Sequence, residues 1–171
     1  MAEISPDALA DLCQECLPAL LALHADDAIK SETLYDELAL VASDAEAAAS
    51  CTSCRKIQAL WGGMGAVYEI ELTATSAAHG RAAGRKSTAP IILKRVELPN
   101  SACTSVGDRR KAASYEVEHA FYERGHAAEL RALGADVPLP LHVCRTEHNR
   151  FMTLAMTKLS GTPAGGGSPP R

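Results

Sequence analysis

The chain has 171 residues and a mass of 18.0 kDa, which is the size of one ordinary domain and excludes a complete two-lobed enzyme of about 300 residues. Hydrophobic residues make up 47% of the chain and charged residues 22%, so it can bury a core and is expected to be mostly folded. The net charge of −4 gives no positive excess to bind a phosphate backbone, and nucleic acid is not an expected partner.

The chain shows no sign of a membrane or secretory segment. No run approaches about 18 apolar residues, the length that spans a bilayer. The amino terminus carries Glu3, Asp7 and Asp11, where a secretory signal would be basic and then apolar. We therefore expect a cytoplasmic protein that does not contact membranes.

Residues 1–50 are expected to form a helical extension. Ser5 followed by Pro6 is typical of a helix start, and leucines then recur at helical spacing. After a polar break, a second apolar series follows at Leu34, Leu38 and Val41. Two helices are therefore predicted, each packing its apolar face on a neighbouring element.

From Lys56 onward, the apolar residues no longer recur at helical spacing. Residues 57–60 and residues 66–72, with apolar and polar side chains alternating in the second stretch, predict two strands. Residues 61–65 between them are rich in glycine and indicate the tip of a hairpin.

The next segment is predicted as loop, strand and helix. Residues 73–89 have no periodicity and are expected as an exposed loop. A buried strand is predicted over residues 90–98, where Lys94 stands among isoleucine and leucine residues. A helix follows over residues 108–124, and Gly125 is expected to break it.

The remaining residues complete an α+β fold. Residues 139–146 and 151–159 predict a second hairpin, and the Gly- and Pro-rich residues 162–171 are expected as a disordered tail. The expected fold is a five-stranded antiparallel sheet with one main helix, preceded by two helices. Residues 56–161 would form this lobe, after the helical extension at residues 1–50.

Four of the six cysteines form two pairs with C-x-x-C spacing. Cys13 and Cys16 lie in a leucine-rich helical pattern, and Cys51 and Cys54 follow further along the chain. Four thiolates at this kind of spacing can bind zinc, whereas small buried thiols are also common in ordinary packing. The long separation between the pairs favours packing, and both interpretations are kept.

Two features of the first hairpin and the third strand indicate phosphate chemistry. The glycines Gly62, Gly63 and Gly65 let backbone amides approach a phosphate closely. Lys94 lies in an apolar strand, where an unpaired ammonium is costly to bury. We therefore expect Lys94 to have an acidic partner.

The helix over residues 108–124 offers two acids, Glu116 and Glu118, as that partner. The basic residues at its start, Arg109, Arg110 and Lys111, are expected to be solvated. A glycine-rich hairpin, a lysine in the next strand, a glutamate in the next helix and two further strands form the ATP-gripping lobe of kinase-like folds. There the glycine loop covers the phosphates, the lysine contacts them, and the glutamate holds the lysine in position.

These motifs resemble two groups of kinases. Residues 60–69, LWGGMGAVYE, look like the glycine loop of Ser/Thr protein kinases, with Leu60 where the first glycine of G-x-G-x-x-G-x-V would be. Residues 114–123 and 152–159 are similar to the CHK-kinase-like (ecdysteroid-kinase-like) proteins, relatives of choline kinases and aminoglycoside phosphotransferases. The similarity covers residues 56–161.

The resemblance implies an ATP site and the residues that build it. The family's helix motif, S-Y-x-V-E-x-x-F-Y, aligns the ion-pairing acid with Glu118 and leaves Glu116 as the second choice. The hinge between lobes would place the backbone at Thr157 and Leu159 against the adenine edge. The implied nucleotide-binding residues are Gly62, Gly63, Gly65, Val67, Lys94, Glu118, Thr157 and Leu159.

The resemblance also implies a second lobe that these residues do not supply. The family's catalytic base lies in an H-x-D or H-G-D loop and its metal-binding Asp in a D-F-G-like segment, both after the hinge. Neither motif follows the hinge in this chain, so no catalytic or metal-binding residue is predicted and the carboxy-terminal lobe is expected to be absent. Mg²⁺ would bind only if a carboxy-terminal lobe were supplied.

The predicted function is therefore the ATP-binding lobe of a small-molecule phosphotransferase that is inactive as this chain alone. Two alternatives are kept. One is a non-catalytic nucleotide-binding or protein-interaction module, whose apolar surface near Met156 and Leu159 would dock on a partner chain. The other is a fragment of a protein kinase.

Overall fold

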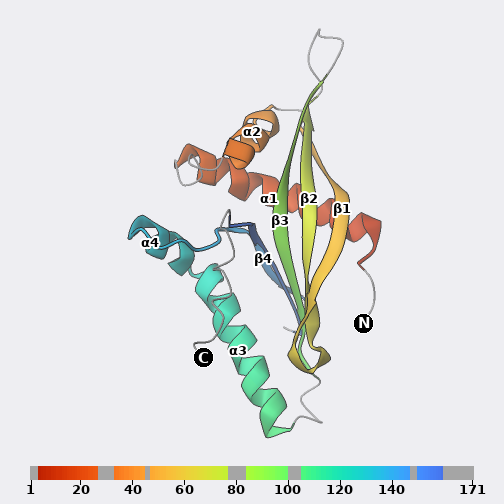
Figure 1. Cartoon of the computed structure of the whole chain (residues 1–171), viewed down its shortest axis with the longest axis vertical. Helices are drawn as coiled ribbons and strands as arrows, with labels where there is room; N and C mark the ends of the chain where they lie inside the picture. Colours follow the sequence, from red (N-terminus) through yellow and green to blue (C-terminus); the bar gives the residue numbers. More distant parts are fainter. Residues whose placement is uncertain are drawn as a thin grey trace, which may run out of the picture.

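The structure is a computed structural model, which describes residues 4–26, 33–44, 47–76, 84–99, 105–146 and 150–159. Within these ranges the chain folds as an α+β unit, with one open five-stranded antiparallel sheet and four α-helices (Figure 1). The predicted fold class is thereby confirmed. The predicted tail at residues 162–171 lies outside the described residues.

The sheet has the strand order β1-β2-β3-β5-β4, and every neighbouring pair is antiparallel. Both predicted hairpins are present as β1 with β2 and β4 with β5. Strand β3 lies at the centre of the sheet and pairs with both hairpins. The strands are β1 Ala48–Ala59, β2 Gly65–Ser76, β3 Arg85–Glu97, β4 Pro140–Thr146 and β5 Phe151–Thr157.

The first three strands are longer than expected. Strand β1 begins at Ala48, inside the range expected to be helical, and β2 and β3 take up most of the described part of residues 73–89, which was expected as a loop. Small Ala, Ser and Thr side chains carry little hydrophobic periodicity, but they pair well across strands. The Thr73 and Thr88 hydroxyls, for example, lie 2.8 Å apart across β2 and β3.

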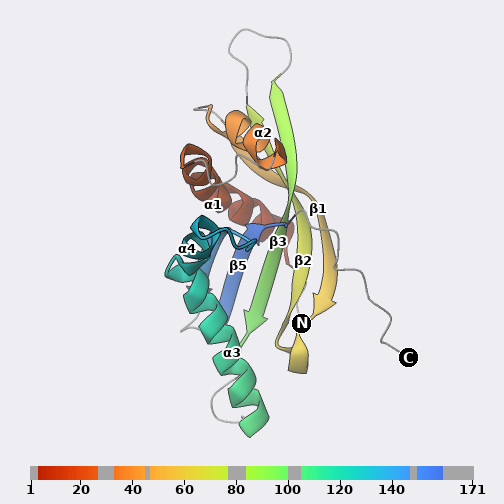
Figure 2. The same cartoon turned by 60° about the vertical axis from the view of Figure 1, so that its left-hand side comes forward.

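Helices α1 (Pro6–Ala25) and α2 (Thr33–Ala42) cover one face of the sheet and form the two leading helices that the sequence predicts (Figure 2). Ser5 caps α1 by accepting a hydrogen bond from the Ala8 amide at 3.2 Å. Both helices share one core with β2 and β3, so the extension packs directly on the sheet. The largest fully buried side chains of this core include Leu20, Leu38, Ile70, Leu72, Ile91 and Leu93.

Helices α3 (Val106–Glu123) and α4 (His126–Ala132) follow β3, and α3 lies on the other face of the sheet. Gly125, at φ +81°, separates them, which confirms the predicted break. The amino-terminal end of α3 lies beside the turn between β1 and β2 (Figure 1). None of the helices in the described ranges is long and apolar enough to cross a membrane.

Tyr35 of α2 fixes the carboxyl end of β5. Its side chain is 2% exposed, its hydroxyl accepts a hydrogen bond from the Lys158 amide at 2.6 Å, and it donates one to the Pro90 carbonyl at 2.5 Å. One side chain therefore joins the helical layer to β3 and to the segment after β5.

We predict that Tyr35→Phe lowers the free energy of unfolding by about 1–3 kcal/mol, because it leaves two partly buried backbone groups without their partner. Urea denaturation of the purified chain measures the change. Tyr68→Phe serves as the matched control, since the Tyr68 hydroxyl makes no such backbone bridge within the described residues. Equal losses in the two variants would contradict the assignment.

Candidate functional site

Lys94 and Glu118 form an ion pair between the central strand and α3. The Lys94 ammonium donates a hydrogen bond to the Glu118 carboxylate, and the two side chains are 15% and 35% exposed. Glu118 is therefore the acidic partner that the buried Lys94 ammonium requires. Glu116, the second choice, lies along an open groove on the outer side of α3 instead.

Aromatic and apolar side chains surround the ion pair. The Lys94 ammonium lies 5.0 Å from the centre of the Tyr115 ring, in the geometry of a cation–π contact. Val96, Met152 and Leu154 line a small cavity beside the same pair. Because these groups exclude water, the attraction between the two charges is stronger here than on an open surface.

His119 fixes the rotation of α3 and thereby the position of Glu118. Its ring is 3% exposed, with Nε2 3.1 Å from the Cys144 carbonyl and Nδ1 3.2 Å from Nε of Arg145. These partners require the neutral tautomer in which Nε2–H donates and Nδ1 accepts. A single histidine between Glu118 and Ala120 of a helix gives no periodic signal, which is why the sequence does not single it out.

The glycine-rich tip is a tight turn that brings β2 against β3. Trp61–Gly63 form a single 3₁₀ turn, in which Gly62 and Gly63 have φ values of +72° and +71°. Gly65 has φ +140°, and a Cβ built there would lie 2.0 Å from the Arg95 carbonyl oxygen. Gly65 is therefore required for close strand pairing, independently of any ligand.

One side of the glycine turn is open, and one of its amides is already hydrogen-bonded within the turn. A Cβ built at Gly63 meets no atom within 4 Å, so this residue is glycine for its backbone conformation alone. The Gly63 amide donates to the Leu60 carbonyl at 3.3 Å. This amide could donate a hydrogen bond to a phosphate only if the turn opened.

Lys111 is a second cation at the turn and is not among the predicted site residues. Its Nζ lies 3.0 Å from the position of a Cβ built at Gly62, and 3.3 Å from the Asp108 carboxylate. Hydrogen bonds from Ser105 and Lys111 hold the pKa of Asp108 below its usual value. Lys111 thus lies against the turn, and the basic start of α3 is not uniformly solvated as expected.

Val67 lies on the same face of the sheet as Lys94, directly opposite it in the pairing of β2 with β3. It packs against a small core cluster made of Leu60, Met64, Val96 and Met152. The turn, the strand with Lys94 and the adjacent strand β5 therefore share one apolar surface.

The predicted hinge residues lie at the carboxyl end of β5. Thr157 is fully buried: its amide donates to the Leu139 carbonyl and its hydroxyl accepts from the Leu139 amide, both at 2.9 Å. Only the Thr157 carbonyl and the backbone of half-buried Leu159 could therefore serve a ligand. Met156 is buried, so it does not contribute to the exposed apolar surface expected at the hinge.

An ion pair crosses the sheet beside this hinge. The Lys158 ammonium lies 3.1 Å from the Glu69 carboxylate, which also meets Arg55 at 3.0 Å. Because β3 lies between β2 and β5, the Lys158 side chain must pass over β3 to reach Glu69. The hydrogen bond from Lys158, together with both cations, lowers the pKa of Glu69.

The four paired cysteines lie on α1 and β1, which pack against each other. Cys13 and Cys16 are fully buried, Cys51 is half-buried and Cys54 is exposed. Within the described ranges, no group of three or more His, Cys, Asp or Glu side chains is arranged to hold a metal ion. The described geometry therefore gives the zinc interpretation no support.

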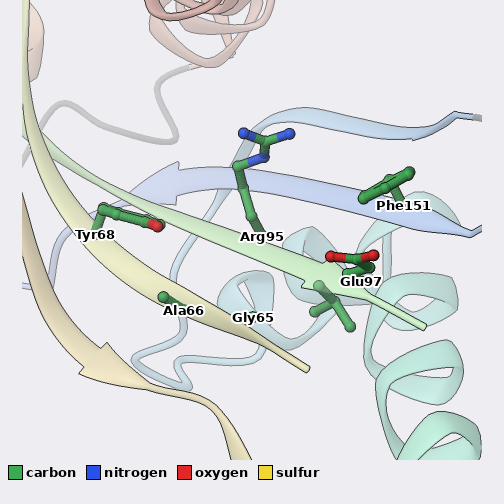
Figure 3. Close-up of a pocket in the computed structure, with 7 residues that line it drawn as sticks. Gly65, Ala66, Tyr68, Arg95, Glu97 and Phe151 are labelled. Atoms are coloured by element: carbon green, nitrogen blue, oxygen red, sulfur yellow. The ribbon is translucent and has the colours of Figure 1, made fainter. Parts of the chain in front are cut away.

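A further hollow lies at the ends of β2 and β3, lined by Gly65, Ala66, Tyr68, Arg95, Val96, Glu97 and Phe151 (Figure 3). Lys94 and Arg95 are consecutive in a strand, so their side chains point to opposite faces of the sheet. The volume of the hollow is about 80 Å³, whereas pockets for small molecules usually measure about 300–1,000 Å³. It is too small to enclose a nucleotide, and so is the cavity of about 10 Å³ beside Lys94 and Glu118.

Comparisons with protein-family models, curated proteins and solved structures find no match in any of the three. The resemblance to the CHK-kinase-like family thus rests on the chain's own motifs.

We predict that Gly65→Ala lowers the free energy of unfolding by about 3 kcal/mol, because the new methyl group collides with the β3 backbone. Gly63→Ala is the matched control: it costs about 1 kcal/mol, since only the backbone conformation is disfavoured there. Thermal and urea denaturation of both variants measure the difference. An equal loss in the two would show that β2 does not approach β3 this closely.

Proposed function

We propose that this chain is the ATP-binding lobe of a kinase-like small-molecule phosphotransferase. The observation that carries the proposal is the ion pair between Lys94 and Glu118, which joins the central strand to the helix beside a glycine turn. The motif order predicts this pair from the sequence, and the geometry brings the two side chains together. An amine held in this way is prepared to meet a phosphate.

In this proposal each part of the site has one task. Lys94 neutralises charge on the α- and β-phosphates, and Glu118 fixes the direction of its ammonium group. Lys111 adds a second positive charge beside Gly62. Val67 offers an apolar surface to the adenine ring, on the same face of the sheet as Lys94.

The open side of Gly63 fits a ligand that approaches the turn from solvent, because no protein atom occupies the place of its missing side chain. The Thr157 carbonyl and the Leu159 backbone would receive the adenine edge. The Lys158–Glu69 ion pair lies on this same face and would have to shift to admit the ring. Mg²⁺ would enter with a second lobe.

The proposed activity of these residues is binding, not turnover. The tripeptide His24-Ala25-Asp26 has the H-x-D form, but it lies at the end of α1, on the face of the sheet opposite Lys94, where His24 meets Asp36 at 3.4 Å. It is therefore not positioned as a catalytic base for a nucleotide at Lys94. As part of this proposal, we place the protein in the cytoplasm, where it has access to ATP.

We predict that Lys94→Ala weakens ATP binding about tenfold or more and leaves the fold intact, because one charge-assisted phosphate contact is lost while Glu118 can be hydrated. Isothermal titration calorimetry of the purified chain measures the affinity, and circular dichroism checks the fold. Arg95→Ala is the control, since it removes the adjacent cation on the opposite face. Equal affinity in wild type and Lys94→Ala, or an equal loss in Arg95→Ala, would contradict the role of Lys94.

We further predict that the purified chain releases no phosphate from ATP above the rate in buffer, since no H-x-D or D-F-G-like segment lies at Lys94 within the described residues. A radiolabelled ATP hydrolysis assay with Mg²⁺ tests this. Steady turnover that is abolished by Lys94→Ala would show that the chain is catalytically complete.

A non-catalytic interaction module is the second candidate function, and the outer face of α3 favours it. Val117 is 70% exposed and lines an open groove with Phe121 and, from β4, Arg145. Apolar surface of this kind often marks a contact with another protein. A chain that binds no nucleotide at millimolar concentration, with its fold intact, would favour this second function over the first.

A further inference from the structure

The two C-x-x-C segments face each other because β1 contains an irregularity. In a regular strand, residues three apart point to opposite faces of the sheet. The pairing of β1 with β2 shifts by one residue between Cys51 and Ser53, so that Cys51 lies opposite Leu72 and Cys54 opposite Ile70. Both partners belong to the core beneath α1, and both cysteines therefore point toward α1.

Helix α1 carries the other cysteine pair. Cys13 and Cys16 are one helical turn apart and fully buried. The Gln14 side chain accepts a hydrogen bond from the Ala49 amide at 3.0 Å, which fixes this turn of the helix against the beginning of β1.

Cys13 and Cys51 face each other where α1 packs on β1. Cys51 packs against the core cluster that contains Cys13. The Cys51 thiol donates a hydrogen bond to the Ser53 carbonyl at 3.1 Å. Cys13 and Cys51 thus come from two different layers of the fold, with Cys51 half-buried at the edge of the sheet.

We propose that Cys13 and Cys51 form a reversible disulfide when the protein meets hydrogen peroxide, and that this bond ties α1 to β1. In the first step, the Cys51 thiolate attacks one oxygen of the peroxide, which gives a sulfenic acid and a hydroxide ion. The Cys13 sulfur then attacks the sulfur of Cys51, a water molecule leaves, and the S–S bond forms. In total two thiols and one peroxide give one disulfide and two waters, and a thiol reductant reverses the bond.

The order of the two steps follows from burial. Cys51 is partly open to solvent and can meet peroxide, whereas Cys13 is enclosed between α1 and the sheet. Burial raises the pKa of Cys13 to about 12, so its thiolate is scarce at neutral pH. Burial also raises the pKa of the Cys51 thiol, and the neighbouring Cys13 thiol opposes part of that increase.

The experiment uses the full chain, reduced, freed of metal and then treated with hydrogen peroxide. Peptide mass spectrometry without reduction is expected to find a peptide pair joined through Cys13 and Cys51, with a loss of about 2 Da, and dithiothreitol should separate it. The oxidised chain should also melt at a temperature higher by roughly 5 °C or more, because the bond closes a long loop.

Two variants make the assignment specific. Cys51→Ala should lower the yield of the Cys13 crosslink at least about tenfold and abolish the rise in melting temperature. Cys144→Ala, which removes a half-buried thiol on β4, should change neither. Crosslinks that join Cys51 to Cys54 instead, crosslinks only between chains, or irreversible oxidation of Cys51 without a bond would overturn the proposal. Zinc added to the reduced chain is a further test: one tightly bound ion that protects both Cys13 and Cys51 from alkylation would replace the disulfide with a metal site.

Discussion

One charged group in an apolar strand determines how the rest of the candidate site is arranged. The Lys94 ammonium cannot leave water without a partner, and α3 supplies Glu118 and the Tyr115 ring for it. This requirement constrains the position of α3, because Glu118 must reach back to the sheet while His119 is bonded to β4. The glycine turn then completes the arrangement, since its own packing on Tyr115 and Lys111 depends on where α3 lies.

The leading helices contribute to the same site from the other face of the sheet. Tyr35 bonds to the segment after β5, so the backbone near Lys158 and Leu159 is held by α2 as well as by the strand itself. The core between the helices and the sheet also contains Cys13, and Cys51 packs against this core. If these two cysteines become joined under oxidation, the helical layer is fastened to β1, the strand that leads directly into the glycine turn.

The sequence predicts best those contacts that the burial of one or two residues makes necessary. A lysine among isoleucines and leucines requires an acid, and the pair with Glu118 follows from that demand together with the helix motif. The strands within residues 73–89 were missed, because small polar side chains such as Thr73 and Thr88 express their preference only when paired across a sheet. The contact of Lys111 with the glycine turn was missed for a similar reason, because it depends on three-dimensional packing. The sequence singles out the two cysteine pairs, but it does not show the shift of one residue in β1 that turns Cys51 and Cys54 to the same face.

The central claim is that Lys94, although 15% exposed, lies where the phosphates of a bound nucleotide would be. An acyl-phosphate derivative of ATP tests this most directly, because it transfers its acyl group to the lysine amine nearest the phosphates. Peptide mass spectrometry should find Lys94 acylated in preference to the exposed Lys56, with excess ATP suppressing the modification. Labelling that follows solvent exposure alone, with Lys56 modified first and no effect of ATP, would contradict the account.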